Sequence, residues 1–403
     1  MRQALSGNKS AAYGAKLCRP SVLAGYPITP QTSLVEYLCQ FVASGELDAT
    51  VVEVESEHSV MSLLTGASMA GSRVFTATSG QGLLYMCEPY IRVSTSRLPI
   101  VMCIVNREVI SPTTVWTGHQ DAITLRDAGW IQIFVENNQE ILDTVIMAFR
   151  VAEDPEVLLP VNVCYDGFYL SHMVDIVDVP DQEAVDRFLP PYQPSQPTLD
   201  PDHPVAIDPG MPGELLTEFR YKHLASMERA KLKIEEVDRE FGRSFGRSYG
   251  GLVEAYRCDD ADYLFVTMGS VTGTARVAID RAREKGMPFG LIKVRALRPF
   301  PAREIAEVAR GKKAMGILDR NVSFGWNSGT LFMEIRSAFM AERVVLPMIN
   351  LIAGLGGVDI TIEQIEDSLV KVMEAEKQGL TQIVHWLNIE PDDCPGLNGA
   401  RPV

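Results

Sequence analysis

Short cysteine spacings are missing from this chain of 403 residues. No two cysteines are separated by only two residues, the Cys-x-x-Cys spacing typical of zinc sites and iron–sulfur clusters. An odd, scattered set also argues against a disulfide framework. We therefore expect buried thiols, at Cys103 and Cys164 above all, and no metal or cluster held by this chain. The seven cysteines are Cys18, Cys39, Cys87, Cys103, Cys164, Cys258 and Cys394.

Positive charge and long apolar runs are also scarce. Lys and Arg total 37 against 52 Asp and Glu, which gives a formal net charge of −15. This balance argues against nucleic acid or an anionic membrane as a partner. No apolar run reaches membrane-spanning length, and the N-terminus lacks the basic and apolar regions of a signal peptide. We expect a cytoplasmic protein of two or three domains.

The sequence does contain a turn bracketed by prolines, Tyr26-Pro27-Ile28-Thr29-Pro30. It follows a short apolar run and precedes a segment with helical periodicity. Proline fixes its own backbone and restricts the residue before it, so Ile28 and Thr29 are predicted to be held extended at the end of a strand. Open α/β sheets bind small molecules at such strand ends.

Three further apolar segments, within 51–58, 75–83 and 99–107, also run into polar or glycine residues before a predicted helix. This repeat predicts β-α units and a parallel sheet. The polar ends are expected to meet at one edge of the sheet, where Thr29, Glu57, residues 79–82 and Arg107 would converge. The predicted strands are 21–25, 50–54, 73–77, 99–105, 131–136 and 159–164, and the predicted helices are 33–44, 57–70, 81–94, 120–128 and 138–153.

Changes in composition divide the chain into four predicted segments. They are an α/β domain over 1–180, a proline-rich strap and connecting helix over 181–250, a second α/β domain over 251–390, and a tail over 391–403. The helix-favouring part of the connection is 227–241. In the second domain we predict strands at 263–270, 289–294 and 314–319 and a helix at 274–285. The turn before that helix lacks Gly-Lys-Ser/Thr, so it is predicted to be a tight β-α turn rather than a nucleotide site.

Six motifs, in order, resemble the alpha subunits of the 2-oxoacid:ferredoxin oxidoreductases, the pyruvate:ferredoxin oxidoreductase group. The resemblance implies a thiamine diphosphate-binding, pyrimidine-type parallel-sheet domain, followed by an α/β domain similar to the C-terminal domain of transketolase. It also implies oxidative decarboxylation of a 2-oxoacid, with coenzyme A taking the acyl group and iron–sulfur clusters taking the electrons. The motifs are Tyr26-Pro27-Ile28-Thr29-Pro30, Ser56-Glu57, 78–84, Asn106-Arg107, 119–132 and 166–172.

Glu57 matches the family glutamate that bonds N1′ of the coenzyme's aminopyrimidine, which sets up proton transfer at C2. From the residues alone, Glu53 and Glu55 are rivals, because they are predicted to alternate along the same strand and share its face. All three also fit an exposed acidic surface. The resemblance further implies coenzyme contacts at Pro27, Ile28, Ser79, Gly80, Gln81 and Gly82.

Arg107 and Thr29 match family residues that contact the substrate. An arginine binds the carboxylate of a 2-oxoacid with two parallel hydrogen bonds, and a threonine hydroxyl adds another. For Arg107 the structural alternative is a salt bridge, and for Thr29 it is a hydroxyl bonded to the backbone of the turn. Arg107, Thr29 and Glu57 are our catalytic candidates.

The segment 111–119 departs from the family pattern, because Gly118 stands where relatives often carry an acid or amide. This segment lies near the substrate pocket in the family, which makes Trp116 and His119 substrate-binding candidates. A larger acid is therefore an alternative to pyruvate: phenylglyoxylate, a branched-chain 2-oxoacid or 2-oxoglutarate. A tryptophan that merely packs is the structural alternative.

The magnesium and diphosphate half-site of the family has no counterpart in this sequence, since Gly-Asp-Gly followed by Asn-Asn is missing. The resemblance places that half, with Mg, on a beta subunit, so the thiamine diphosphate site would be shared between chains. Gamma- and delta-type subunits would carry the [4Fe-4S] clusters and the coenzyme A site. The same absence motivates an alternative of another class, a non-catalytic scaffold subunit.

Overall fold

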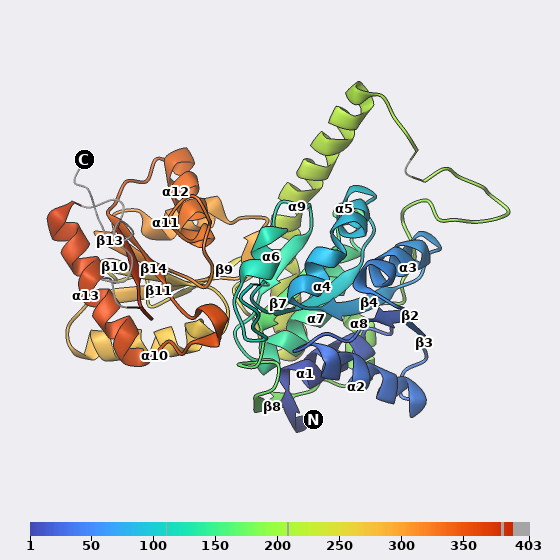
Figure 1. Cartoon of the computed structure of the whole chain (residues 1–403), viewed down its shortest axis with the longest axis horizontal. Helices are drawn as coiled ribbons and strands as arrows, with labels where there is room; N and C mark the ends of the chain where they lie inside the picture. Colours follow the sequence, from blue (N-terminus) through green and yellow to red (C-terminus); the bar gives the residue numbers. More distant parts are fainter. Residues whose placement is uncertain (110, 208, 380–382, 390–403) are drawn as a thin grey trace.

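The computed structural model describes residues 1–109, 111–207, 209–379 and 383–389. Within these residues the chain forms two large sheets, each with helices on both faces, and a small antiparallel pair of strands. The two sheets lie side by side in Figure 1, the first in blue to green and the second in yellow to red. The predicted tail, 391–403, lies outside the described residues.

The first sheet has the strand order β12-β6-β7-β5-β4-β2-β3. All neighbours are parallel except β12, which pairs antiparallel with β6. Strands β4, β5, β6 and β7 are buried on both faces because they are continuous apolar runs covered by helices on both sides. The strands are β2 (Val22–Gly25), β3 (Thr50–Glu53), β4 (Val74–Thr78), β5 (Val101–Asn106), β6 (Ile131–Phe134), β7 (Val161–Asp166) and β12 (Ala296–Arg298).

Seven helices accompany these strands in the described part of the chain. They are α1 (Gly7–Leu17), α2 (Thr32–Ala43), α3 (Glu57–Met69), α4 (Gly80–Tyr85), α5 (Cys87–Thr95), α6 (Gln120–Thr124) and α7 (Asn138–Ala152). The predicted helix 81–94 is interrupted at Met86. The ring of Pro89 would clash with the carbonyl of Tyr85, four residues earlier, so one helix ends there and another begins. The predicted helix 120–128 ends at Thr124.

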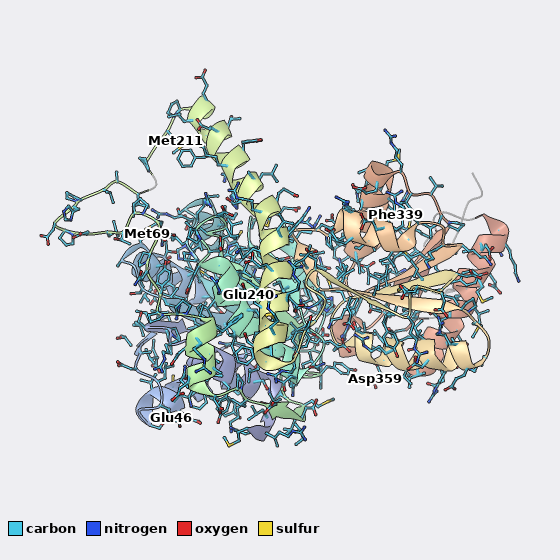
Figure 2. The ribbon with its side chains drawn as sticks, turned by 180° about the vertical axis from the view of Figure 1, so that it is seen from behind. Glu46, Met69, Met211, Glu240, Phe339 and Asp359 are labelled. Atoms are coloured by element: carbon cyan, nitrogen blue, oxygen red, sulfur yellow. The ribbon has the colours of Figure 1, made fainter. Side chains whose placement is uncertain are left out.

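The connecting region contains more regular structure than predicted. Strand β8 (Val174–Asp178) pairs with β1 (Arg2–Ser6), and α8 (Gln182–Phe188) precedes an extended stretch. Helix α9 (Gly213–Phe245) is 33 residues long and contains the predicted 227–241. Figures 1 and 2 show its N-terminal half projecting from the body near Met211, while the half around Glu240 lies against the first sheet's helices. The apolar periodicity follows this division, because the buried residues of α9 lie between Ser226 and Phe241.

The second sheet has the order β15-β14-β13-β10-β11-β9, with β9 antiparallel to β11 and the other neighbours parallel. Helices α10 and α13 cover one face, and α11 and α12 cover the other. The predicted helix 274–285 begins earlier, at Val271. The elements are β9 (Val253–Tyr256), β10 (Tyr263–Thr267), α10 (Val271–Glu284), β11 (Phe289–Val294), α11 (Ala302–Ala309), β13 (Ala314–Asp319), α12 (Thr330–Glu342), β14 (Met348–Ile352), the short 3-10 helix η1 (Leu355–Gly357), α13 (Ile362–Gln378) and β15 (Ile383–Trp386).

Several contacts join the sheets, and two of them lie at the edge strand β6 and helix α7. Strand β12 leaves the second unit and completes the edge of the first sheet. Close by, Glu140 of α7 is fully buried and binds Lys293 and Arg295, which lie at the end of β11. No helix in the described ranges is long and apolar enough to cross a membrane.

Candidate active site

Glu57 is the first residue of α3 and is buried, with 6% of its surface exposed. Strand β3 ends at Glu53, and Ser56 caps the helix by accepting a hydrogen bond from the Ser59 amide at 3.2 Å. Burial raises the pKa of the Glu57 carboxyl, and a hydrogen bond from its own backbone N–H opposes this increase. A buried acid at a helix start is thus held close to the carboxyl edge of the sheet.

The prediction that Glu53, Glu55 and Glu57 alternate along one strand is wrong. The strand stops at Glu53, because the Ser56 cap begins a helix three residues later. Glu55 is exposed and accepts a hydrogen bond from the Ser59 hydroxyl. Of the three acids, only Glu57 is buried.

The start of α4 lies against Glu57 and Arg107. A Cβ atom on Gly82 would lie 2.5 Å from Glu57 Oε1 and 2.6 Å from Thr78 Oγ1, so only glycine fits. Gly80 has a φ of +48°, and its Cβ position is 3.1 Å from Arg107 Cδ. Ser79 donates its hydroxyl to the Val105 carbonyl at 2.5 Å, which fixes the turn to the neighbouring strand.

Arg107 follows β5 and is almost fully buried. Its Nη1 donates to the Thr29 carbonyl at 3.0 Å and its Nε to the Thr114 carbonyl at 2.9 Å. Burial lowers the pKa of this guanidinium, while Asp121 opposes the shift. No carboxylate of the described residues lies within ion-pair distance of Arg107, so the alternative of a structural salt bridge has no support there.

Thr29 is exposed, and its contact with Arg107 is made by its backbone carbonyl. The preceding Ile28 is half-buried, and Pro27 is exposed. The turn is fixed from beneath by Gln31, whose Nε2 donates to the Ala77 carbonyl at 3.0 Å. The structure therefore brings Thr29, Arg107, Glu57 and the α4 turn together at the carboxyl edge of the first sheet, as predicted.

Asp121 is a site residue to which the sequence assigned no role. It is fully buried and accepts hydrogen bonds from Gly80 N at 3.0 Å, Arg107 N at 2.9 Å and Asn106 Nδ2 at 2.8 Å. Burial raises the pKa of this carboxyl, and the hydrogen bonds oppose that shift. Asp121 joins the ends of β4 and β5. The only signal in the sequence was its place in the motif His119-Gln120-Asp121.

Trp116 and His119 lie apart from this group. Trp116 is 48% exposed, and its ring packs against Phe168 at 4.4 Å between ring centres. His119 is buried, and its Nε2 lies 2.9 Å from Asp166 Oδ1. Asp166 in turn accepts from Ser270 N at 2.8 Å and pairs with Arg320 at 3.1 Å. The structure thus places His119 at the junction between the two sheets.

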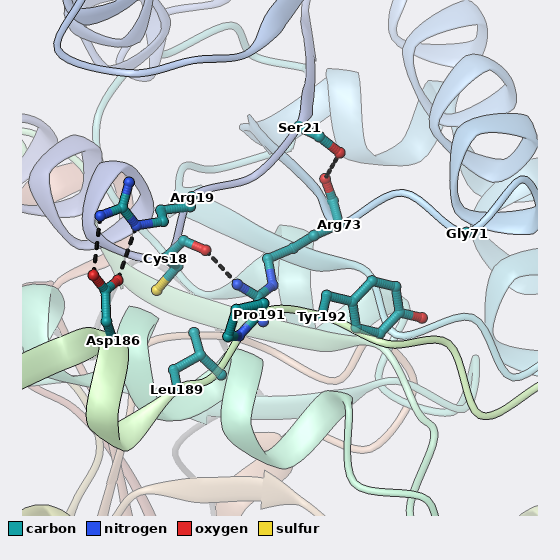
Figure 3. A pocket seen from close by; sticks show the side chains of 9 residues that line it. All are labelled: Cys18, Arg19, Ser21, Gly71, Arg73, Asp186, Leu189, Pro191 and Tyr192. Carbon is teal, nitrogen blue, oxygen red and sulfur yellow. Dashed lines mark hydrogen bonds and ion pairs between the residues drawn. The ribbon is translucent and has the colours of Figure 1, made fainter.

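A cavity of about 500 Å³ lies at the opposite edge of the first sheet (Figure 3). It is next to Ser21 and Arg73, which precede β2 and β4 and so mark the amino ends of the strands. Its charged groups are paired within the chain, Arg19 with Asp186 and Arg73 with Glu153. This cavity is remote from the candidate site.

The fold defines the class of protein first. The structure resembles a 2-oxoglutarate:ferredoxin oxidoreductase from Magnetococcus marinus solved with 2-oxoglutarate, coenzyme A and succinyl-CoA bound, with a TM-score of 0.70 and 20% identity. The alignment covers 93% of this chain and 65% of that one. A split-gene transketolase matches with a TM-score of 0.53 and 11% identity, over 93% of this chain and 100% of that one. The class is therefore the α/β fold shared by these proteins, and the predicted fold is confirmed.

The chain belongs to the pyruvate flavodoxin/ferredoxin oxidoreductase family. The thiamine diphosphate-binding model of that family matches residues 13–239, and the model of pyruvate:ferredoxin oxidoreductase core domain II matches 261–365. The predicted family and the predicted enzyme class, an alpha subunit of a 2-oxoacid oxidoreductase, are confirmed.

Three curated relatives span nearly the whole chain. The alpha subunit of an NADH-dependent phenylglyoxylate dehydrogenase from Aromatoleum evansii is 45% identical, over 95% of this chain and 94% of that one. The pyruvate synthase subunit PorA of Methanocaldococcus jannaschii is 47% identical, over 92% and 95%. The ketoisovalerate oxidoreductase subunit VorA of Pyrococcus abyssi is 43% identical, over 97% and 98%.

The residues at the carboxyl edge fit thiamine diphosphate. The Glu57 carboxyl is buried there, and no ion-pair partner for it occurs in the described part of the chain. Thr78 Oγ1 lies beside it, buried and without a hydrogen-bond partner. Gln81 Oε1, in the first turn of α4, is also buried without a partner. Polar atoms left unsatisfied around a glycine are suited to a polar ligand. Across the described ranges, no group of three or more His, Cys, Asp or Glu side chains is arranged to hold a metal.

Proposed function

We propose that this chain supplies the aminopyrimidine side of a thiamine diphosphate site in a heteromeric oxidoreductase that converts a pyruvate-type 2-oxoacid and coenzyme A to acyl-CoA and CO2. When bound, the coenzyme supplies the nucleophile and electron sink for decarboxylation. The observation that carries the proposal is the burial of Glu57 beside Gly82, at the start of a helix and next to the unpartnered Thr78 hydroxyl.

Glu57 holds a proton at the pyrimidine N1′ in this proposal. Because burial raises its pKa, Glu57 shares a proton with a ligand more readily than an exposed carboxylate does. A general acid–base group must share a proton in this way near neutral pH. Gly82 lets a ring approach the carboxyl, because any side chain there would occupy the space beside Oε1. Ser79, Gly80 and Gln81 border the same space, and Pro27 and Ile28 form the adjoining turn.

Arg107 binds the carboxylate of the 2-oxoacid. Two of its N–H groups are fixed by the carbonyls of Thr29 and Thr114, which orients the guanidinium without neutralising it. A buried cation without an acidic partner is a favourable place for an anion. The exposed Thr29 side chain lies at the same edge and is the second substrate contact. We keep Trp116 and His119 as candidates for contacts with the part of the substrate that lies beyond Arg107.

The remaining machinery belongs to partner chains. We propose a beta subunit with the magnesium and diphosphate half-site, and gamma- and delta-type subunits with [4Fe-4S] clusters and the coenzyme A site. The names of the relatives as subunits alpha, PorA and VorA support a multi-subunit assembly. In this chain, residues 1–180 serve the coenzyme, 181–250 connect, and 251–390 form the second domain.

Phenylglyoxylate is the second candidate substrate. The aryl-acid relative is about as similar to this chain as the pyruvate synthases, at 45% against 47% identity. A panel of 2-oxoacids with the purified complex decides between them. We expect the preferred acid to have a kcat/KM at least about tenfold above the others, which corresponds to about 1.4 kcal/mol.

The role of Glu57 is tested by Glu57→Gln in the whole complex, with 2-oxoacid-dependent reduction of a viologen dye as the assay. We expect turnover to fall by about 10²–10⁴-fold, the range typical of lost acid–base catalysis. Glu55→Gln is the matched control, because Glu55 is exposed two residues away, and it should keep full activity. Near-normal turnover of Glu57→Gln would reject the assigned role.

The scaffold alternative is tested by locating the coenzyme. A structure of the complex with thiamine diphosphate within hydrogen-bond distance of the Glu57 carboxyl eliminates it. The coenzyme bound elsewhere, with Glu57 facing only protein, would support it.

A further inference from the structure

Glu108 follows Arg107 directly, and its side chain turns to a separate cavity. Its Oε1 accepts a hydrogen bond from Gly356 N at 3.3 Å, from the 3-10 helix of the second unit. A Cβ atom on Gly118 would overlap the Glu108 carboxyl. Gly118 is therefore the residue that makes room for this acid. The glycine at 118, where relatives often carry an acid or amide, thus makes space for the carboxyl of Glu108.

The cavity has a volume of about 480 Å³ and lies between the two units. Glu108 is the only charged residue among its described lining residues, and the others are apolar or neutral. A cavity of this size holds a small-molecule side chain. Representative walls are Leu84, Thr114, Gln120, Val322 and Phe324.

The loop at Thr114 and the helix α4 border both the cavity and Arg107. Thr114 lines the cavity, and its backbone carbonyl accepts the hydrogen bond from Arg107 Nε. Leu84 lines the cavity from α4, the helix whose first residue, Gly80, abuts Arg107. Both contacts bring the cavity next to the residues that hold the Arg107 guanidinium.

We propose that this cavity is the subsite for the substrate's acyl chain, and that Glu108 makes the enzyme select monocarboxylic over dicarboxylic 2-oxoacids. This rests on the proposed function, because it takes Arg107 as the anchor of the substrate carboxylate. A second carboxylate at the far end of the chain would enter a space with one acid and no cation in its lining. At and above neutral pH, where Glu108 is ionised, its charge repels a second carboxylate, and burial strengthens that repulsion. Apolar chains, straight, branched or aromatic, meet no such penalty.

The test compares 2-oxovalerate with 2-oxoglutarate, which share a five-carbon chain and differ in the second carboxylate. With the whole wild-type complex at about pH 8, where Glu108 is ionised, we expect kcat/KM to favour 2-oxovalerate by about 10²-fold or more. In Glu108→Gln that preference should narrow at least about tenfold, chiefly through a lower KM for 2-oxoglutarate. Glutamine keeps an acceptor oxygen for the Gly356 amide. Glu55→Gln is the matched control and should leave the preference unchanged.

Two further measurements keep the test independent of folding and of turnover. Gln120→Lys places a cation in the cavity and should raise activity on 2-oxoglutarate, a gain that a misfolded protein cannot show. Protection of the wild-type complex against heat should be greater with valerate than with glutarate, and Glu108→Gln should reduce that difference. An active Glu108→Gln complex with the wild-type preference would overturn the inference. A complex that oxidises no 2-oxoacid at all would overturn the proposed function instead.

Discussion

Glu57, Arg107 and Glu108 are three ionisable side chains near one sheet edge, and none of them has a charged partner in the described part of the chain. Unpaired buried charges cost free energy, so each must be compensated when the protein works. Arg107 lacks an anion. Burial raises the pKa of Glu57, and it raises the pKa of Glu108 to about 7, so Glu108 carries its charge only at and above neutral pH. The site is thus preorganised for one anion and for ligands that share or donate a proton.

Replacing Arg107 by lysine should weaken substrate binding more than it slows chemistry. Lysine keeps the charge but loses the planar fork and the two hydrogen bonds to Thr29 and Thr114. One charge-assisted hydrogen bond contributes about 1.5–3 kcal/mol, so we expect kcat/KM to fall about 10–100-fold, mostly through KM. Steady-state kinetics of the complex with 2-oxovalerate measures this. An unchanged KM would remove Arg107 from the substrate site.

Glu108 should also make stability depend on pH. Burial raises its pKa to about 7, with the Gly356 bond and Arg320 opposing and Asp121 adding to the shift, against an ordinary value of 4.5. The folded chain then binds a proton between pH 7 and 4.5 that the unfolded chain does not. This contribution to stability is present at low pH and is lost as pH rises towards 7.

Glu108→Gln removes that proton uptake. The variant should be more stable than the wild type by up to about 3 kcal/mol above pH 7, and the difference should disappear near pH 4.5. Melting temperatures of the two complexes between pH 5 and 8 show the effect. A constant difference across this range would contradict the raised pKa.

The convergence of Glu57, Arg107 and residues 79–82 at one sheet edge was predictable, because strand ends meet in a parallel sheet. Their selection as site residues rested on the family resemblance. The partners of Asp121 and the overlap between Gly118 and Glu108 depend on loop paths, which local patterns do not determine. His119 was a substrate-binding candidate through the family resemblance alone, and its bond to Asp166 could not be read from the sequence.

At the scale of elements, the cap of α3 positions Glu57. Ser56→Ala should cost about 1 kcal/mol through the lost cap, and it should also lower turnover because the first turn of α3 carries the acid. Thr361 caps α13 with a full capping box, far from the site. Thr361→Ala should therefore cost a similar free energy and leave turnover unchanged. Equal activities of the two variants would mean that the Ser56 cap does not position Glu57.

The elements themselves were predictable where periodicity is strong. Strands β2 to β7 lie within about two residues of their predicted positions, because each contains a short run of apolar residues, although β3 is only half-buried. The break between α4 and α5 depends on Pro89, and β1 pairs with β8 across about 170 residues. No local sequence pattern predicts that two strands so far apart in the sequence will pair.

At the scale of the whole molecule, buried charges hold the two sheets together. Glu140 bonds Lys293 and Arg295, each at 2.7 Å, although more than 150 residues separate them in the sequence. Burial alone would raise the pKa of Glu140, but Lys293 and Arg295 together hold it below its ordinary value. Asp166, Ser270 and Arg320 form a second polar contact between the sheets. The cavity at Glu108 lies between the same two units, so its shape depends on how they are joined.

Glu140→Gln should loosen this joint. It leaves Lys293 and Arg295 buried with less negative charge, and removing one partner of a buried ion pair typically costs about 3–5 kcal/mol. We expect a clear fall in the melting temperature of the complex, together with a weaker preference for 2-oxovalerate over 2-oxoglutarate as the cavity opens to water. Glu307→Gln, which breaks an exposed pair with Arg303, is the control and should change neither quantity. Replacing all three buried residues, Glu140→Leu with Lys293→Met and Arg295→Met, should recover much of the stability, because an apolar cluster of similar volume needs no partner charge and Glu136, which also binds Lys293, keeps its pair with Arg276. If the triple variant is as unstable as Glu140→Gln, packing at this joint matters more than its charge balance.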